Sequence, residues 1–431
     1  MILLRNCSWV VTQNANREIL RNVDISIEDD RIAGIGCNLT TKDYIIDCSD
    51  KIVLPGLINS HTHLPMTLFR GYADDLLLQE WLEDKIWPLE SNLTEKHVYR
   101  GAVLGMLELV KAGITTFHDM YFFGTAVKRA AEESGVRTFF AQAIVDFPTA
   151  EFRNSSGAFR AFENLAKSSS ELFTPTVGTH SQYTCSTETL LKAKELARKY
   201  ETLLHIHVAE TRKEVYESLE EHGRRPVEYL NEIGFLDKNV VAVHLGWITK
   251  EEISMLSKTG AKAVHCPVSN MKLGVGGVAP LAEMFDNSIA VALGTDSPVS
   301  NNSLDLFEEM KVAALLQKMH RWDPRVIPAQ IALDMATING AKALGIEHLL
   351  GSVEVGKKAD LILLELTSPH LTPCHDIVSN LVYSAKSSDV ATTIVNGKIL
   401  MEDYEVKTLD EPEILAKASE SALELVSKLE K

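Results

Sequence analysis

Hydrophobic runs of strand length recur along the middle of the chain, and segments with a helical period of apolar residues lie between most of them. This alternation is typical of parallel strands joined by crossover helices. We therefore predict an α/β fold, a (β/α)₈ barrel of the TIM type, with an open doubly wound sheet as the alternative. No glycine-rich phosphate-binding fingerprint follows any run, which counts against a dinucleotide-binding domain. The runs span residues 52–59, 114–118, 136–145, 175–180, 203–209, 240–245, 262–266 and 289–295.

Several helical segments also carry signals at their ends. Thr94 has the residue type and position of an N-cap, and Ala112-Gly113 has the composition of a helix end. Further helices are predicted over residues 188–199 and 225–233, and an amphipathic one over residues 411–431.

The two ends of the chain are similar to each other and differ from the middle. Both hold short strand patterns separated by tight turns, such as those at 23–28 and 31–35. The simplest arrangement pairs the two ends. We predict a small composite β-sandwich domain from residues 1–54 and 350–431, which includes the C-terminal helix, and a catalytic barrel domain from residues 55–349.

Composition narrows the class of protein. A chain of 431 residues is too long for one compact core and suggests about two domains. The formal net charge of −16 disfavours nucleic acid as a partner, because the surface would repel phosphates. Six scattered cysteines indicate reduced thiols, and we find neither a signal peptide nor an apolar run long enough to span a membrane. We therefore expect a cytoplasmic protein that binds no membrane.

Residues that can ligate a metal follow several of the hydrophobic runs. His61 and His63 follow the first run, His207 lies in the fifth, and Asp296 follows the eighth. In a barrel the C-terminal ends of the strands carry the chemistry, and side chains at i and i+2 share one face of a strand. The sequence therefore predicts one mononuclear site with three imidazoles and one carboxylate. Such a set suits Zn²⁺ and also accepts Fe²⁺ or Mn²⁺.

These segments resemble the signatures of the amidohydrolase superfamily, and the resemblance covers nearly the whole chain. A loop with Glu80-Trp81-Leu82 and Ile86-Trp87-Pro88-Leu89-Glu90 is similar to that of the 5-methylthioadenosine/S-adenosylhomocysteine deaminases, a group that includes the archaeal 5'-deoxyadenosine deaminases. The superfamily segments are Pro55-Gly56-Leu57-Ile58-Asn59-Ser60-His61-Thr62-His63, His207-Val208-Ala209-Glu210, His244, residues 263–270, Gly294-Thr295-Asp296-Ser297, residues 336–345 and residues 356–360.

The resemblance implies a metal-dependent aminohydrolase with one divalent ion per chain, most simply Zn²⁺. Its substrates would be 5'-modified adenosines, namely 5'-deoxyadenosine, 5'-methylthioadenosine and S-adenosylhomocysteine, together with adenosine itself. The products would be the inosine derivatives and ammonia. The family also implies a homo-oligomer, a dimer or a tetramer. The implied metal ligands are His61, His63, His207 and Asp296, and the implied substrate contacts are Glu210 and His180 to the purine and Glu90 to the ribose hydroxyls.

Binuclear hydrolases of this architecture bridge their two metals with a carboxylated lysine on the fourth strand. The fourth predicted strand, around residues 174–180, has no lysine and ends in His180. We therefore expect a mononuclear site, and we assign His180 to the substrate.

Hydrolysis of a 6-aminopurine requires an activated water and an acid for the ring nitrogen N1. A Zn²⁺ ion lowers the pKa of a bound water to about 7 from about 15.7. His244 and Asp296 are placed to orient that water and take its proton, and Glu210 is placed to protonate N1. Glu90 can accept hydrogen bonds from both vicinal hydroxyls of a ribose.

Two further residues concern the 5' substituent. Trp81 is expected to pack against it, with a purely structural buried position as an equal alternative. Arg153 is the candidate for binding the carboxylate of a homocysteine tail. The remaining strand histidines, His118, His205 and His265, are interpreted as internal packing residues, His205 with a hydrogen bond.

Two other functions remain open from the sequence. A hydrolase of guanine, cytosine or a chlorotriazine would share the fold, but it would have no ribose diol for Glu90 to bind. A non-catalytic relative could act as an assembly protein, although the ligand set is intact. A nucleic-acid base deaminase is disfavoured, because the His-x-Glu and Pro-Cys-x-x-Cys signature is absent.

Overall fold

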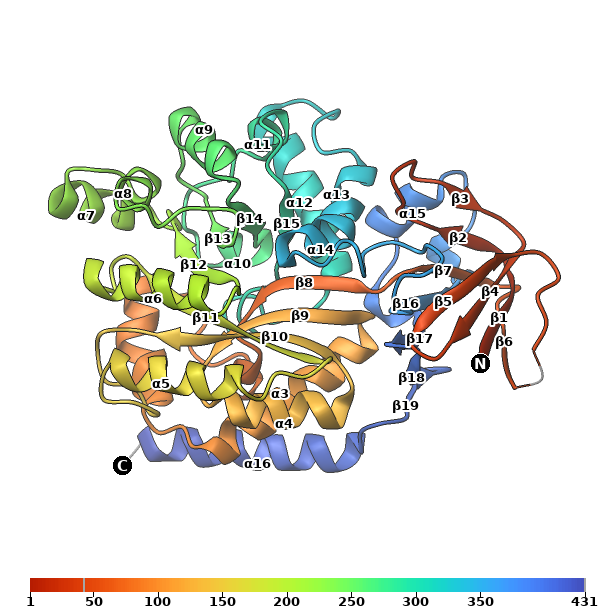
Figure 1. Ribbon diagram of the computed structural model, residues 1–431, viewed down its shortest axis with the longest axis horizontal. Coiled ribbons are helices and arrows are strands. Elements are labelled where there is room, and N and C mark those ends of the chain that lie inside the picture. Colours follow the sequence, from red (N-terminus) through yellow and green to blue (C-terminus); the bar gives the residue numbers. More distant parts are fainter. Residues whose placement is uncertain (42, 430–431) are drawn as a thin grey trace.

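The computed structural model describes residues 1–41 and 43–429 of the chain. Its centre is a sheet of eight parallel strands, each paired with the next strand along the sequence (Figure 1). The first and last strands meet through a parallel bridge between Thr62 and Asp296, where Asp296 N donates to His61 O at 3.0 Å. The strands are β8 (Leu57–Thr62), β9 (Ile114–Tyr121), β10 (Arg137–Ile144), β11 (Phe173–Ser181), β12 (Leu204–Val208), β13 (Val240–His244), β14 (Lys262–His265) and β15 (Val291–Leu293).

Helices connect these strands on the outside of the barrel (Figure 1). The expected N-cap at Thr94 is present: its hydroxyl accepts from His97 N, and the His97 ring accepts from Thr94 N at 3.2 Å. The helices are α3 (Glu95–Lys111), α4 (Gly124–Ser134), α5 (Ser155–Ala166), α6 (Thr187–Lys199), α7 (Arg212–His222), α8 (Pro226–Glu232), α9 (Lys250–Thr259), α10 (Pro267–Lys272), α11 (Leu281–Asp286), α12 (Leu306–Arg321), α13 (Ala329–Ala336) and α14 (Ile338–Leu344).

The first hydrophobic run, 52–59, is divided between two sheets, and its prediction as one barrel strand is wrong. Its first half belongs to β7 (Lys51–Pro55) in a sheet outside the barrel, and its second half starts β8. Gly56 lies at the break. A Cβ atom on Gly56 would lie 2.1 Å from Thr115 Oγ1, so only glycine allows the two sheets to approach here. Periodicity alone could not reveal the break, because both halves are buried and apolar.

The two ends of the chain form a sandwich of two sheets at one side of the barrel (Figure 1). Strand β16 (Leu361–Glu365), from the C-terminal part, pairs antiparallel with β7, from the N-terminal part. The predicted fold class, a barrel with a sandwich built from both ends, is confirmed. The other strands are β1 (Ile2–Cys7), β2 (Trp9–Val11), β3 (Ile19–Leu20), β4 (Val23–Glu28), β5 (Arg31–Gly36), β6 (Tyr44–Asp47), β17 (Val390–Val395), β18 (Lys398–Glu402) and β19 (Glu405–Val406).

The C-terminal helix α16 (Glu411–Leu429) lies against the barrel rather than the sandwich with which the sequence groups it. It runs along helix α3 (Figure 1). Arg100 of α3 donates to Glu420 at 2.7 Å, and Lys111 donates to Glu411 at 2.8 Å. Leu425 is fully buried in this contact. The rest of the proposed domain division stays a prediction.

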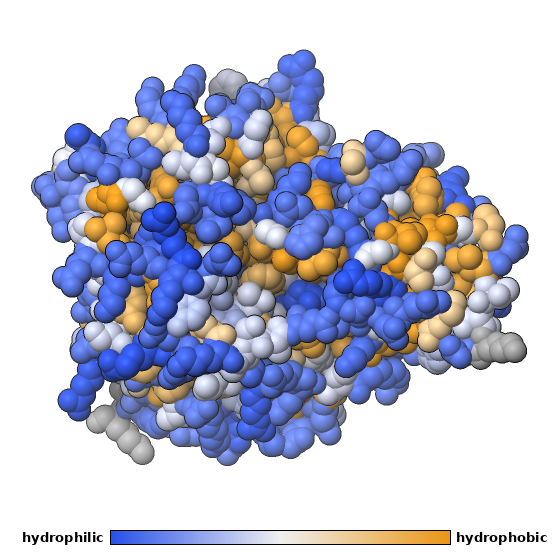
Figure 2. Space-filling model, viewed as in Figure 1, coloured by the Kyte–Doolittle hydropathy of each residue, from blue (hydrophilic) through white to orange (hydrophobic). Residues whose placement is uncertain are grey.

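The remaining helices are short. The helix α15 (Ile377–Tyr383) and the 3₁₀ turns η3 (Pro369–Leu371) and η4 (Ser387–Asp389) lie between strands β16 and β17. Figure 2 shows hydrophilic residues over most of the face it presents, with apolar residues gathered over the sandwich. Among the described residues, no helix combines the length and apolarity needed to cross a membrane.

Candidate metal centre and substrate pocket

The residues expected to ligate a metal come from the ends of three barrel strands. His61 lies in β8 and His63 directly follows it, His207 lies in β12, and Asp296 follows β15. Their side chains are buried, except that His63 retains 16% exposure. The structure therefore brings these four residues to the one edge of the barrel where active sites of this fold occur.

The spacing of their ligand atoms suits a single ion. Asp296 Oδ1 lies 3.2 Å from His61 Nε2 and 3.3 Å from His63 Nε2. His207 Nε2 lies 3.3 Å from His61 Nε2. Ligands about 2.0–2.1 Å from a tetrahedral ion are separated by about 3.3–3.4 Å. The three separations match this value, so the ligand atoms next to His61 and Asp296 are spaced to bind one Zn²⁺-type ion.

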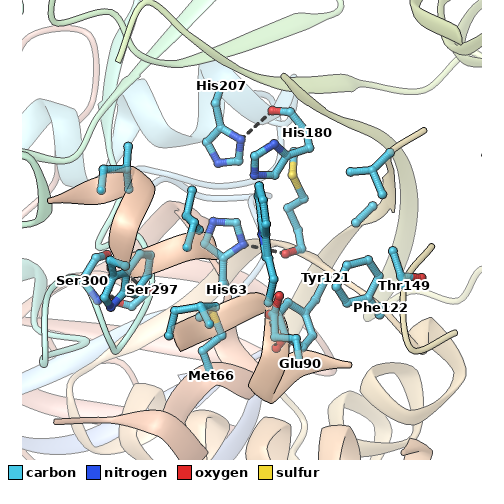
Figure 3. Close-up of a pocket in the computed structure, with 18 of the residues that line it drawn as sticks. His63, Met66, Glu90, Tyr121, Phe122, Thr149, His180, His207, Ser297 and Ser300 are labelled. Atoms are coloured by element: carbon cyan, nitrogen blue, oxygen red, sulfur yellow. Dashed lines mark hydrogen bonds between the residues drawn. The ribbon is translucent and has the colours of Figure 1, made fainter. Parts of the chain in front are cut away.

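The other nitrogen of each ring is held by a hydrogen bond (Figure 3). His63 Nδ1 donates to Met120 O at 2.7 Å, and His207 Nδ1 donates to His180 O at 2.6 Å. Since a carbonyl can only accept, Nδ1 carries a proton, and Nε2 is the nitrogen that faces the metal site. Such partners fix the tautomer of metal-binding histidines. His61 Nδ1 instead faces the ring of His205 at 2.8 Å.

The buried Asp296 carboxylate is negatively charged, and a positive charge beside it must balance it. Burial alone would raise the pKa of Asp296, but its contacts with His61 and His63 hold that pKa well below the ordinary value. Burial would likewise lower the pKa of His63, but the Asp296 carboxylate outweighs it and raises the pKa to about 9. Burial lowers the pKa of His61 to about 4. A cation bound among these groups would supply the charge that a proton on His63 otherwise provides.

Several features orient Asp296. Ser269 and Ser300 donate to its Oδ2 atom, at 2.5 and 3.1 Å, and leave Oδ1 facing the histidines. A Cβ atom on Gly294 would lie 2.8 Å from His61 Cβ, so glycine lets strand β15 approach β8. Asp296 itself has a φ of 60°. Aspartate adopts this left-handed conformation at lower cost than most residues, so its residue type suits the position.

His244 and Glu210 line the same edge. His244 Nδ1 lies 2.9 Å from Asn270 Oδ1, and its Nε2 lies 3.8 Å from Glu210 Oε2. The nitrogens of His61, His207 and His244 all lie within 4.8 Å of one another. His244 therefore borders the metal site while it also faces the carboxyl group of Glu210.

The loop that carries Glu210 is fixed from below by Glu214 of helix α7. The Glu214 carboxyl accepts from the backbone N–H groups of Ala209 and Glu210, both at 2.8 Å. Burial raises the pKa of Glu214 to about 8 and raises the pKa of Glu210 above its ordinary value. Glu210 thus retains its proton to a higher pH than an exposed glutamate, as a general acid requires.

A pocket opens from the metal centre toward solvent. The segment after β8 supplies much of its wall through 3₁₀ turn η1 (Leu64–Phe69), α1 (Leu78–Trp81), π-helical turn η2 (Leu82–Ile86) and α2 (Trp87–Glu90). Trp81, Glu90, His180 and Glu210 all line it, as the sequence predicts. Arg153 does not line it and is exposed. The apolar lining residues are Met66, Leu78, Leu82, Ile86, Trp87, Met120, Phe122, Ala143, Val145, Phe147, Pro148, Ala150 and Leu273.

Glu90 lies in this pocket beside Tyr121. Figure 3 shows His180 and His207 toward one end, Glu90 with Tyr121 toward the other, and His63 between them. The Tyr121 hydroxyl donates to Glu90 Oε1 at 2.7 Å. Burial raises the pKa of Glu90 to about 7, and the bond from Tyr121 opposes this shift. Burial also lowers the pKa of His180 to about 3, so this imidazole is neutral.

Sequence reasoning missed the partners that position these groups. Tyr121, Glu214, Asn270, Ser269 and Ser300 each hold a site residue in place. Tyr121 offered one signal, because it ends a barrel strand. Ser269 and Asn270 lie in the segment 263–270 that resembles the superfamily, but the resemblance assigned them no role. Ser300 follows a strand end without a distinctive pattern, and the contacts of all three appear only in the fold.

Three imidazoles and a carboxylate at the C-terminal ends of barrel strands define the metal-dependent hydrolase class of this fold. The family model for the amidohydrolase family matches residues 52–400. The chain belongs to the amidohydrolase family, and the resemblance seen in the sequence is confirmed.

Similar proteins extend this result over the full chain. A 5'-deoxyadenosine deaminase of Methanosarcina mazei is 44% identical, with 99% of each chain covered. A 5-methylthioadenosine/S-adenosylhomocysteine deaminase of Thermoanaerobacter pseudethanolicus is 42% identical, with 99% of this chain and 100% of the relative covered. The crystal structure of an adenosine deaminase from Xanthomonas campestris with bound zinc has a TM-score of 0.96 at 31% identity, and covers 99% of this chain and 98% of that one.

Proposed function

We propose that this protein is a metal-dependent aminohydrolase that deaminates 5'-modified adenosines to the corresponding inosine derivatives and ammonia. The observation that carries the proposal is the pocket itself, whose lining joins three of the four candidate ligands, His63, His207 and Asp296, to Glu210 and Glu90. The relatives named as 5'-deoxyadenosine and 5-methylthioadenosine/S-adenosylhomocysteine deaminases support this substrate class.

We assign one Zn²⁺ per chain to His61, His63, His207 and Asp296. A bound zinc ion lowers the pKa of a coordinated water to about 7. The spacing of the ligand atoms supports zinc, as does the zinc bound by the Xanthomonas relative. A second ion is not proposed, because strand β11 (Phe173–Ser181) contains no lysine that could become a bridging ligand.

The residues around the reacting carbon divide the proton transfers between them. His244 and Asp296 orient the attacking water and take its proton. Glu210 delivers a proton to purine N1, which makes C6 electrophilic. The proton taken from the water then passes to the departing amino group, and the proton of the new C6 hydroxyl returns to Glu210 as the C6–N bond breaks. A buried Glu210 with a raised pKa is protonated more readily when substrate arrives. Such acid–base assistance contributes on the order of 10²–10⁴-fold to the rate.

The opposite end of the pocket recognises the nucleoside. Glu90 accepts hydrogen bonds from the vicinal ribose hydroxyls, and His180 contacts the purine. The partly buried Glu90 carboxyl faces the pocket beside Tyr121. A free base or a chlorotriazine offers no diol to this carboxyl, so Glu90 favours a nucleoside over those substrates. Glu90→Gln should raise the KM for nucleosides and change kcat less.

The pocket lining also bears on the 5' substituent. Among the described lining residues there is no lysine or arginine, and Trp81 and Leu78 offer apolar surface. Small apolar groups, as in 5'-deoxyadenosine and 5'-methylthioadenosine, suit this surface better than an amino-acid tail. Arg153, exposed and outside the lining, is not needed for it. Arg153→Ala should leave kcat/KM for all of these substrates unchanged.

The direct test is deamination by purified, zinc-loaded protein. Loss of the adenosine absorbance band should occur with 5'-deoxyadenosine and 5'-methylthioadenosine, and more slowly with S-adenosylhomocysteine and adenosine. Ammonia should appear in equal amount. No reaction with any of the four nucleosides would overturn the proposal, and a faster reaction with guanine or cytosine would favour a free-base hydrolase.

We propose a cytoplasmic location. All six cysteines are free thiols, which is consistent with a reducing cytoplasm. We also propose a homo-oligomer, which sedimentation of the purified protein would test.

A further inference from the structure

A row of buried histidines leads from the metal centre into the interior of the barrel. His61 Nδ1 lies 2.8 Å from His205 Nε2, and His205 Nδ1 lies 2.9 Å from His118 Nδ1. The row ends at Thr176, whose Oγ1 atom lies 2.8 Å from His118 Nε2. All four side chains have no exposed surface. Each separation is within the range of a hydrogen bond.

The direction of these hydrogen bonds follows from counting protons. A neutral imidazole has one N–H donor and one nitrogen acceptor. If His61 Nε2 keeps its lone pair for the ion, its proton is on Nδ1 and is donated to His205 Nε2. His205 then carries its proton on Nδ1 and donates it to His118. His118 in turn donates from Nε2 to the Thr176 hydroxyl, which can accept.

An extra proton would break this order. A doubly protonated His205 would direct an N–H group at the N–H group of His61, only 2.8 Å away between nitrogens. The geometry is therefore satisfied by three neutral rings whose N–H groups all point away from the metal centre.

We propose that His205 and His118 are positioning residues for the metal centre, which fix the tautomer and ring orientation of His61 through a one-way chain of N–H donors. This inference rests on the metal site of the proposed function, because the lone pair at His61 Nε2 sets the direction of the chain. His63 and His207 are fixed by backbone carbonyls, which can only accept. His61 depends on side chains that could adopt either tautomer.

The two histidines of His205-Ile206-His207 on β12 thus have different roles. Residues at i and i+2 share one face of a strand, so both rings point into the barrel. His207 lies at the mouth as a ligand, and His205 lies one layer deeper as the support of the ligand from β8. The interpretation of His205 as a hydrogen-bonded packing residue is thereby extended to a specific task.

The first test measures Zn²⁺ affinity of the full-length protein by competition with a chromogenic chelator. His205→Phe removes the acceptor for His61 and should weaken zinc binding about 10–100-fold, the range for partners behind metal ligands. His118→Phe should weaken it less, because it loosens only His205. His205→Gln offers a carbonyl acceptor in the same position and should restore most of the affinity.

His265→Phe is the matched control. His265 is a buried histidine of the neighbouring strand β14, and neither of its ring nitrogens has a hydrogen-bond partner among the described residues. Its replacement should leave zinc affinity unchanged. Equal zinc affinities of wild type and His205→Phe would overturn this inference but would leave the proposed function standing. A wild-type protein that binds no zinc would overturn the proposed function and the inference with it.

A second test needs no variant and therefore does not depend on folding of a mutant. A neutron diffraction map of the zinc-loaded, deuterium-exchanged protein should place deuterium on His61 Nδ1, His205 Nδ1 and His118 Nε2. Deuterium on His205 Nε2 would reverse the chain and contradict the inference.

Discussion

The sandwich and the barrel of this protein have interiors of opposite character. Between the two sandwich sheets lie apolar side chains such as Leu361 and Leu363, which have no exposed surface. Inside the barrel, His118, His205 and Thr176 are just as buried. Buried polar groups cost free energy unless they are hydrogen-bonded. The comparison indicates that the sandwich interior is built for stability and that part of the barrel interior is built to hold a reactive centre.

Left-handed backbone conformations also differ between the sandwich and the barrel. In the sandwich, left-handed residues such as Asp29 and Asn396 occur in hairpin turns, where Asp and Asn adopt this conformation at low cost. In the barrel, His244 and Leu245 have φ values of 73° and 53° although they are buried. Their strain lies beside the metal centre, where surrounding contacts hold it.

The largest expected effect is that of His63→Ala. Loss of one imidazole opens the metal shell, and without the ion the attacking water returns to a pKa of about 15.7. Zinc and activity should be lost together, with turnover below detection. Metal analysis and the deamination assay on one preparation check this. A variant that retained zinc and full turnover would remove His63 from the ligand set.

Glu210→Gln should separate catalysis from metal binding. The amide keeps the shape of the side chain but cannot deliver a proton to N1, so kcat should fall on the order of 10²–10⁴-fold. Zinc content should stay at the wild-type level, because Glu210 faces His244 and is not among the proposed ligands. Wild-type turnover in this variant would refute the role of Glu210 as the acid.

Leu363→Ala tests the apolar interior of the sandwich. Truncation of this fully buried side chain between the sandwich sheets should lower the free energy of unfolding by about 2–5 kcal/mol. The affinity for zinc should not change. Urea unfolding followed by chelator competition on folded protein measures both quantities. A matching loss of zinc affinity would show that the sandwich contributes to the metal centre.

The raised pKa of Glu90 predicts a smaller effect, on the pH dependence of the free energy of unfolding. Burial raises the pKa of its carboxyl from 4.5 to about 7, so the folded protein keeps a proton that the unfolded chain loses earlier. The stability from this proton is full below pH 4.5 and is lost as the pH rises through 7, by at most about 3 kcal/mol. The Glu90 carboxyl is partly exposed in the pocket, which reduces this value.

The matched variant is Glu90→Gln, whose amide does not titrate. Between pH 5 and pH 8 wild type should lose more stability than Glu90→Gln, as measured by urea unfolding at both pH values. Parallel pH profiles of the two proteins would contradict the raised pKa of Glu90.

The strand pattern of the sequence was sufficient to predict the barrel and the meeting of His61, His63, His207 and Asp296. Strand ends of a closed parallel barrel must converge at one edge, so the prediction needed only the order of the runs. The pairing of the chain ends in a sandwich followed from their shared texture of short strands.

Other features depend on contacts that no local pattern encodes. The break at Gly56 requires knowledge of Thr115 on the next strand. The position of α16 on the barrel depends on ion pairs with α3, such as that between Lys111 and Glu411. The exposed position of Arg153 and the Tyr121–Glu90 hydrogen bond likewise arise only from the fold.

Anomalous diffraction at the zinc absorption edge, from crystals of zinc-loaded protein, tests the central claim most directly. The account predicts one zinc peak per chain, about 2.0–2.2 Å from His61 Nε2, His63 Nε2, His207 Nε2 and a carboxylate oxygen of Asp296. The absence of a peak among these four side chains, or two peaks of full occupancy there, would contradict it.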